Sequence, residues 1–393
     1  MKKYSKRLDK LPPYIFSIIN SLKKEAYEKK LDVIDLGMGN PDLPTPDIII
    51  DRLIDTIKNH HGTHRYPQAK GMPKLRKAIC NWYKRRFDVD INPDNEVIVL
   101  IGSKEGIAHM CMTYLDIGDT ALVSNPAYPA HLNNIVLAGG NIYDMPLLAE
   151  NKWLPDLSKI PEKIAKKAKF MILNYPNNPT AAVVEDLTFF KEVVRFAKKY
   201  DIIVCHDNAY SEVTFDDFVA PSFLQTPGAK DVGVEFYSLS KTYNMAGWRV
   251  GFCLGNPEII APLEKFKSFV DYGVPTFLQL AAVAALCSED GIMKPTLDEY
   301  KKRRDKFCDG LNKLGFLVEK PKATMYLWAK IPEKFQKKGS LHFSEQLIKN
   351  TGIVCLPGSG FGKYGEGYVR FALVTHFNRF HDALLRLKKF LRN

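Results

Sequence analysis

Residues 238–249 have the sequence Ser-Leu-Ser-Lys-Thr-Tyr-Asn-Met-Ala-Gly-Trp-Arg, and this stretch decides the fold. It follows an apolar run at 234–237 that predicts a buried strand. Lys241 therefore stands just beyond a strand end, where desolvation lowers the pKa of an ammonium and favours the free amine. Such an amine can condense with an aldehyde, and the neighbouring hydroxyls and Arg249 could hold a phosphate on the same molecule. For this stretch alone, a surface lysine and a helix-end cation would be the better explanation, so the rest of the chain has to decide.

The middle of the chain alternates short apolar runs with helical patterns. Four of these runs predict buried strands, at 120–123, 169–173, 202–205 and 234–237. Between two of them, residues 185–199 carry apolar side chains at helical spacing. Strands that alternate with helices predict an α/β fold, in which helices cover a mostly parallel sheet. From about residue 290, a long amphipathic helix and short strands predict a smaller second domain.

Polar, turn-forming residues follow each predicted strand directly. In open α/β sheets, ligands bind beyond the carboxyl ends of the strands, so these ends predict one site. Asp207 stands at one end, and a carboxylate against an apolar strand needs a positive partner such as a protonated pyridine nitrogen. Tyr210 and Asn178 could bond a phenolic oxygen on the same ring, although Asn178 also fits plain turn chemistry. Tyr128 could stack on the ring or be a core aromatic.

A second phosphate-binding segment is Gly-Ser-Lys-Glu-Gly at 102–106, between a predicted strand at 97–101 and an amphipathic helix. Backbone N–H groups and the Ser103 hydroxyl at a helix N-terminus form a natural seat for a phosphate. Equally, Ser103 could be an ordinary N-cap with Glu105 in the first turn. The segment alone does not decide between them.

Composition limits the classes of function. The 393 residues include seven scattered cysteines without a Cys-x-x-Cys pair, which predicts neither a disulfide framework nor a metal site. The net charge is +12, but the basic residues are interspersed with acidic ones and form no nucleic-acid-binding motif. No nucleic-acid partner is therefore expected. The apolar runs are too short to cross a bilayer, and the basic start has no apolar segment behind it. These features predict a cytoplasmic protein without a membrane partner.

Together these segments resemble one family, the class I and II aminotransferases of the aspartate aminotransferase superfamily, with pyridoxal-phosphate (PLP) fold type I. The motifs are Tyr-Pro-Asn-Asn-Pro-Thr at 175–180, His-Asp-Asn-Ala-Tyr at 206–210, and the stretch 238–249, in the family's order along nearly the whole chain. The resemblance implies a mostly parallel seven-stranded sheet sandwiched by helices in a large domain, 46–288. It also implies a smaller α+β domain built from 1–45 and 289–393.

The resemblance further implies a role for each candidate site residue. Lys241 holds pyridoxal 5′-phosphate as a Schiff base and acts as the catalytic base, with Asp207 and Tyr210 as the other catalytic residues. The remaining cofactor-binding residues are Ser103, Lys104, Tyr128, Asn178, Ser238 and Arg249, joined by Tyr66 from a neighbouring subunit. The substrate-binding residues are Arg370, which grips the α-carboxylate, Gly39, Asn178 and Tyr128. The implied active unit is thus a homodimer with shared active sites.

Within the family, several segments look like bacterial glutamate–pyruvate (alanine) aminotransferases. These are 11–16, 102–106, 243–248, 321–326 and Ala181, which replaces a glycine of many relatives. The expected reaction converts L-alanine and 2-oxoglutarate to pyruvate and L-glutamate, with ping-pong kinetics through pyridoxamine phosphate. Alternatives are LL-diaminopimelate, aspartate, or methionine and aromatic aminotransferases, or a C–S β-lyase on the same scaffold. A PLP-sensing regulator is a rival of another class. Residues 14–16 and 274–277 are expected to border the side-chain pocket.

Overall fold

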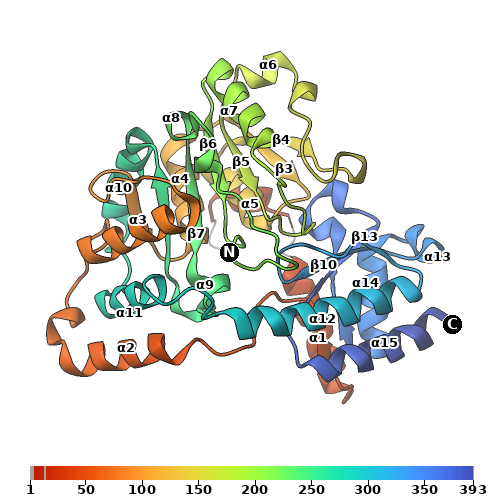
Figure 1. Ribbon diagram of the computed structural model, residues 1–393. Helices are drawn as coiled ribbons and strands as arrows, with labels where there is room; N and C mark the ends of the chain where they lie inside the picture. Colours follow the sequence, from red (N-terminus) through yellow and green to blue (C-terminus); the bar gives the residue numbers. More distant parts are fainter. Residues whose placement is uncertain (1–3, 13–14, 393) are drawn as a thin grey trace.

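The computed structural model describes residues 4–12 and 15–392 (Figure 1). A seven-stranded sheet has the order β2-β8-β7-β6-β5-β3-β4. Its strands are β2 (Val97–Leu100), β3 (Thr120–Asn125), β4 (Asn141–Pro146), β5 (Ala168–Asn174), β6 (Ile203–Asp207), β7 (Gly233–Ser238) and β8 (Gly251–Gly255). Only β8 pairs antiparallel with its neighbours, which confirms the predicted mostly parallel seven-stranded sheet.

Helices cover both faces of this sheet, because successive side chains along each strand point to opposite faces. In β5, Phe170 packs with α4 (Ser103–Tyr114), α5 (Pro129–Ala138) and α10 (Pro257–Val270) in one apolar cluster. Met171 packs with α3 (Pro73–Phe87), α7 (Thr188–Tyr200) and α11 (Thr276–Leu286) in another. The helix predicted at 185–199 is α7, which begins three residues later. Burial on both faces explains why the strands are continuous apolar runs.

The rest of the chain builds smaller sheets with their own apolar cluster. The four-stranded antiparallel sheet contains β9 (Leu317–Val318), β10 (Tyr326–Lys330), β12 (Leu356–Pro357) and β13 (Tyr368–Ala372). A parallel pair joins β1 (Ile34–Asp35) near the N-terminus to β11 (Ile353–Val354). The other helices are α1 (Ile15–Glu28), α2 (Asp47–Asn59), α6 (Glu162–Ala165), α8 (Ala229–Val232), α9 (Leu239–Thr242), α12 (Lys294–Lys313), α13 (Glu333–Gln336), α14 (Gly339–Thr351) and α15 (Phe377–Arg392). The exact domain boundaries stay a prediction.

Two simple properties bear on the sequence-based expectations. Among the residues that the structure describes, no helix is both long and apolar enough to cross a membrane. All seven cysteines fall within the described ranges and are free thiols, and six of them are buried.

Candidate active site

Three neighbouring strands bring the predicted site residues to one edge of the sheet. In the parallel register, the last residue of β5, Asn174, pairs with the last residue of β6, Asp207. The Asn174 side chain donates to the Asp207 carbonyl at 2.7 Å and accepts from the Asn178 backbone N–H at 2.8 Å. It thereby ties the loop after β5 to the end of β6. β7, the next strand, runs into Lys241 through α9.

Lys241 lies in the short helix α9, whose N-cap is Ser238. The Ser238 hydroxyl accepts from the backbone N–H of Ser240 at 3.2 Å, which holds the start of this turn. The Lys241 amine donates to the Gly39 carbonyl at 2.6 Å. Burial lowers the pKa of Lys241, and the nearby cations of Arg370 and Arg249 act in the same direction. The amine is therefore biased towards its neutral, nucleophilic form.

Asp207 is buried, with 5% of its surface exposed. One carboxylate oxygen, Oδ2, lies 3.0 Å from His131 Nε2 at the start of α5. The other, Oδ1, has no hydrogen-bond partner among the described residues although it is shielded from solvent. An unpaired buried carboxylate oxygen is costly, so the site suits a ligand with an N–H or a positive charge at this point. His131 was not predicted from the sequence.

The start of α4 lies beside a positively charged side chain. The N-cap of α4, Gly102, has a φ of 76°, which favours glycine. A Cβ on Gly102 would lie 2.6 Å from Arg249 Nη2, so the guanidinium packs directly against this N-terminus. Ser238 pairs with Gly251 across β7 and β8, and a Cβ on Gly251 would lie 2.9 Å from the Ser103 backbone nitrogen. A helix N-terminus beside a guanidinium is a favourable anion site.

Arg370, in β13, is 2% exposed. Its Nη1 donates to Asn178 Oδ1 at 2.6 Å, and its Nη2 donates to the Gly37 carbonyl at 2.8 Å. Its Nε has no partner within the part of the chain that the structure describes. Burial lowers the pKa of this guanidinium, although it stays charged. A buried fork with spare donors matches the geometry of a carboxylate.

Tyr210 is buried beside β10, the strand that pairs with β13, where Arg370 lies. Its hydroxyl lies 3.0 Å from the hydroxyl of Tyr326, and burial raises the pKa of Tyr210. The Tyr326 hydroxyl also lies against Gly39, because a Cβ added there would be 2.0 Å from it. Tyr326 was not among the predicted site residues, and its sequence context resembles that of any core aromatic.

Three predicted residues stand at the margin of this cluster. The Tyr128 ring packs edge-on against His131, with 5.5 Å between ring centres, and so lies near the partner of Asp207. Lys104 is exposed on the first turn of α4. Tyr66 is 83% exposed and its ring packs against Tyr272 at 4.8 Å. The role of Tyr66 in a neighbouring subunit stays a prediction.

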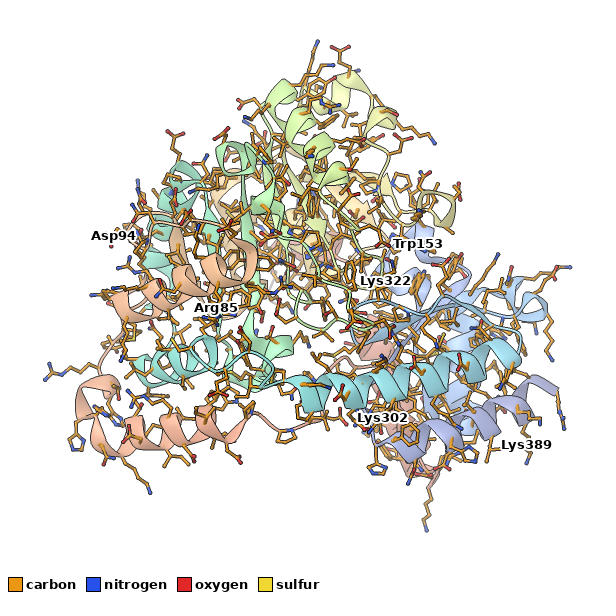
Figure 2. The ribbon with its side chains drawn as sticks, viewed as in Figure 1. Arg85, Asp94, Trp153, Lys302, Lys322 and Lys389 are labelled. Carbon is orange, nitrogen blue, oxygen red and sulfur yellow. The ribbon has the colours of Figure 1, made fainter. Side chains whose placement is uncertain are left out.

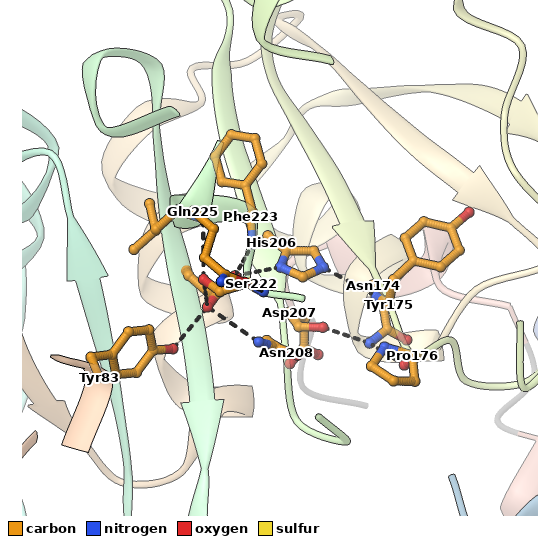
Figure 3. Close-up of polar contacts among 12 residues, drawn as sticks. Tyr83, Asn174, Tyr175, Pro176, His206, Asp207, Asn208, Ser222, Phe223 and Gln225 are labelled. Carbon is orange, nitrogen blue, oxygen red and sulfur yellow. Dashed lines mark hydrogen bonds and ion pairs between the residues drawn. The ribbon is translucent and has the colours of Figure 1, made fainter. Parts of the chain in front are cut away.

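Glu235 is a fully buried carboxylate on β7 that bonds side chains from α3, from β6 and from the segment after β6. Glu235 Oε1 accepts from Tyr83 at 2.8 Å and from Ser222 at 2.6 Å, and Oε2 lies 2.7 Å from His206 Nδ1 (Figure 3). Burial alone would raise the pKa of Glu235, but the bonds from His206, Ser222 and Tyr83 outweigh it and lower the pKa. The sequence feature that could have indicated these contacts is a single acidic residue inside an apolar run, because a buried carboxylate needs hydrogen-bond partners.

Replacing Glu235 with Gln should lower the free energy of unfolding by about 3 kcal/mol, because one amide oxygen cannot serve all the donors that face the carboxylate. A denaturant titration at pH 7 measures this loss. Since the pKa of Glu235 is lowered from 4.5, wild type loses this contribution as the pH falls below that value, and the two proteins converge. As a matched control, Glu162→Gln removes an exposed ion pair with Lys166 and should leave stability unchanged. Equal stability of Glu235→Gln and wild type at pH 7 would contradict the expectation.

Two other features lie outside this cluster. A cavity of about 1620 Å³ is lined by Thr180, Trp153 and Lys322, the last two labelled in Figure 2, but not by Lys241 or Arg370. Glu105, His109 and Asp271 could together ligate a metal ion. However, the ammonium of Lys267 bonds both carboxylates, at 2.8 Å and 2.5 Å, and already supplies the positive charge.

Comparisons with known proteins match this geometry. The family described as aminotransferase class I and II matches residues 31–379. A curated LL-diaminopimelate aminotransferase of Moorella thermoacetica is 48% identical, over 98% of each chain. The glutamate-pyruvate aminotransferase AlaC of Escherichia coli is 46% identical, over 98% of this chain and 93% of its own.

Solved structures agree with the sequence relatives. Substrate-bound BacF from Bacillus subtilis superposes with a TM-score of 0.94 and 40% identity, over 99% of this chain and 98% of that chain. The fold is therefore PLP fold type I, as the sequence predicted. The chain belongs to the class I and II aminotransferases, enzymes that exchange an amino group between an amino acid and a 2-oxo acid, and its cofactor is pyridoxal 5′-phosphate.

Proposed function

We propose that this aminotransferase acts on LL-diaminopimelate, with 2-oxoglutarate as the first acceptor to test. Several curated relatives that are 46–48% identical carry the LL-diaminopimelate name, and they match the chain over nearly its whole length. The alanine reaction predicted from the sequence becomes the second candidate, supported by the likeness to AlaC. For either donor, the observation that carries amino transfer is the cluster of Lys241, Asp207 and Arg370.

The residues of the cluster fit pyridoxal 5′-phosphate in three places. The unpaired Asp207 Oδ1 suits the protonated ring nitrogen, and the Arg249 guanidinium at the N-terminus of α4 suits the phosphate. The Lys241 amine, with its lowered pKa, suits the aldehyde. When bound, the cofactor supplies an electron sink for negative charge at the substrate Cα.

The remaining chemistry belongs to this chain's own groups. Arg370 binds the substrate α-carboxylate through its spare N–H donors and so fixes the orientation of Cα. Lys241, as a free amine, would take up the proton at the substrate Cα and hold it for transfer, which is the role of a general base. Asn178 orients Arg370 through the 2.6 Å bond. Tyr210 offers its hydroxyl proton to the ring oxygen. With one site for two successive substrates, the kinetics are ping-pong.

LL-diaminopimelate places a further demand on the site, because its far end carries a second ammonium and carboxylate. A pocket that hydrogen-bonds this end would reject alanine strongly, whereas an apolar pocket would discriminate by only ~1–3 kcal/mol per methylene. Of the predicted pocket wall, Val274 is buried and Phe277 packs 6.2 Å from His64. In the other predicted segment, 14–16, Tyr14 lies outside the described residues and Ile15 is buried.

The donor preference decides between the two candidates. Purified holoenzyme with 2-oxoglutarate should form glutamate from LL-diaminopimelate with a kcat/KM at least about 10-fold above that for L-alanine. Parallel reactions contain L-aspartate or L-methionine. The meso isomer of diaminopimelate is the matched control, since it has the same atoms with one inverted centre, and a site that binds both ends should use it poorly.

Two outcomes would assign a different reaction to the enzyme. A higher kcat/KM for L-alanine would reject the diaminopimelate proposal and favour the glutamate–pyruvate reaction. Pyruvate and ammonia formed from cystathionine without any oxo acid would instead support a C–S β-lyase. That reaction needs no second substrate, so leaving out 2-oxoglutarate separates it cleanly from amino transfer.

A further inference from the structure

Tyr326 contacts three residues of the site from the four-stranded sheet, which it shares with one of them, Arg370. It lies in β10 and is 3% exposed. Its neighbour Trp328 pairs with Arg370, and since alternate residues share a face, Tyr326 and Arg370 point to the same side. The Arg370 guanidinium carbon lies 4.0 Å from the centre of the Tyr326 ring. The ring therefore packs against the guanidinium and supports it from one side.

The hydroxyl of Tyr326 makes the other two contacts. It lies 3.0 Å from the Tyr210 hydroxyl and against the backbone at Gly39, whose carbonyl accepts from Lys241. Each tyrosine carries one hydroxyl proton, so only one of the two protons can lie between the oxygens. If Tyr326 donates to Tyr210, the Tyr210 proton is free to point into the site.

The charges around Tyr326 favour this direction. Burial alone would raise its pKa, but the cations of Arg370 and Lys241 and the bond with Tyr210 outweigh burial and lower it. Burial raises the pKa of Tyr210. The Arg370 guanidinium, 4.0 Å from the centre of the Tyr326 ring, also repels the Tyr326 hydroxyl proton, which favours Tyr326 as the donor and Tyr210 as the acceptor.

We propose that Tyr326 is a positioning residue for amino transfer. Its hydroxyl donates to Tyr210 and turns the Tyr210 proton towards the cofactor's ring oxygen, while its ring supports Arg370 in the orientation that binds a carboxylate. The proposal rests on the proposed roles of Tyr210 and Arg370, and it holds whichever amino acid is the preferred donor.

The Tyr326→Phe variant tests the hydroxyl, because it keeps the ring and the packing. A donor bond to the ring oxygen favours negative charge there and lowers the pH midpoint of the bound cofactor's absorbance change. Weakening that bond in Tyr326→Phe should raise the midpoint by about half a unit. The value of kcat should fall by about 2- to 10-fold, with KM almost unchanged. Tyr210→Phe should shift the midpoint in the same direction and further.

The Tyr326→Leu variant tests the ring. Loss of the ring that packs against the Arg370 guanidinium should raise the KM for the amino acid by about 10-fold beyond that of Tyr326→Phe. Tyr114→Phe is the matched control, since it removes a hydroxyl of α4 that donates to the Ile259 carbonyl of α10 at 3.0 Å, away from these contacts. It should leave both the midpoint and KM unchanged. Thermal unfolding and cofactor content of each variant confirm that it is folded.

Two results would overturn the proposal, and they are distinguishable. If Tyr210→Phe shifts the midpoint but folded Tyr326→Phe does not, Tyr326 is only a core aromatic and the proposed site stands. If neither variant shifts the midpoint, the proposed role of Tyr210 falls together with that of Tyr326. Because the absorbance titration needs no substrate, both results are independent of the donor.

Discussion

Replacing Lys241 with alanine should lower the rate of amino transfer by about 10⁴-fold or more. The variant loses the amine that we propose forms the covalent link and moves the Cα proton, and no other lysine of the described cluster lies at this point. Pyridoxal phosphate should still bind, since Arg249, the start of α4 and Asp207 remain. Single-turnover absorbance measurements with added amino acid provide the rate.

Lys241→Arg is the matched variant, because it keeps a long cationic side chain. A guanidinium stays protonated at every working pH and cannot take the Cα proton, so this variant should be as inactive as Lys241→Ala. A small external amine, which can replace a missing base, should restore part of the activity of the alanine variant. Substantial transamination by Lys241→Ala without such an amine would remove Lys241 from its proposed role.

Replacing Arg370 with glutamine should raise the KM for amino and oxo acids by about 10²–10³-fold. The substrate carboxylate would lose a buried, charged, two-pronged partner, and glutamine offers no charge. Initial rates over a wide range of substrate concentrations measure this effect. The absorbance of the bound cofactor should change little, which separates this loss from a general collapse of the site.

Arg370→Lys serves as the control for charge. It keeps the positive charge but not the planar fork or the bonds to Asn178 and Gly37. Its KM should lie between those of wild type and the glutamine variant. A KM unchanged in Arg370→Gln would show that the α-carboxylate binds elsewhere.

Much of this site could be predicted from local sequence. Strands β5, β6 and β7 are buried on both faces, so they are mostly apolar runs that end at polar residues. The chemistry of such a sheet lies at those ends, and Asn178, Asp207 and Lys241 were predicted there. The structure brings them to one edge through the parallel register of the strands.

The rest depends on packing between distant segments. Tyr326 and His131 are an aromatic in a strand and a histidine in a helix, and their local patterns do not differ from those of core residues. Only the tertiary fold brings Tyr326 to Tyr210 and His131 to Asp207. Ala181 was recognised as a departure from a family glycine. The structure adds that its φ is 59°, a conformation that favours glycine.

The guanidinium of Arg370 joins three parts of the chain that are far apart in sequence. It bonds the carbonyl of Gly37, just after β1, and the side chain of Asn178, after β5, from its own place in β13. Of its five N–H donors, these two bonds leave three, including Nε, for a ligand. A carboxylate that accepts from these donors adds hydrogen bonds at Arg370, where the three segments of the folded chain already meet. Substrate affinity is therefore linked to heat resistance, and carboxylates that bind more tightly protect the fold against heat in the same order.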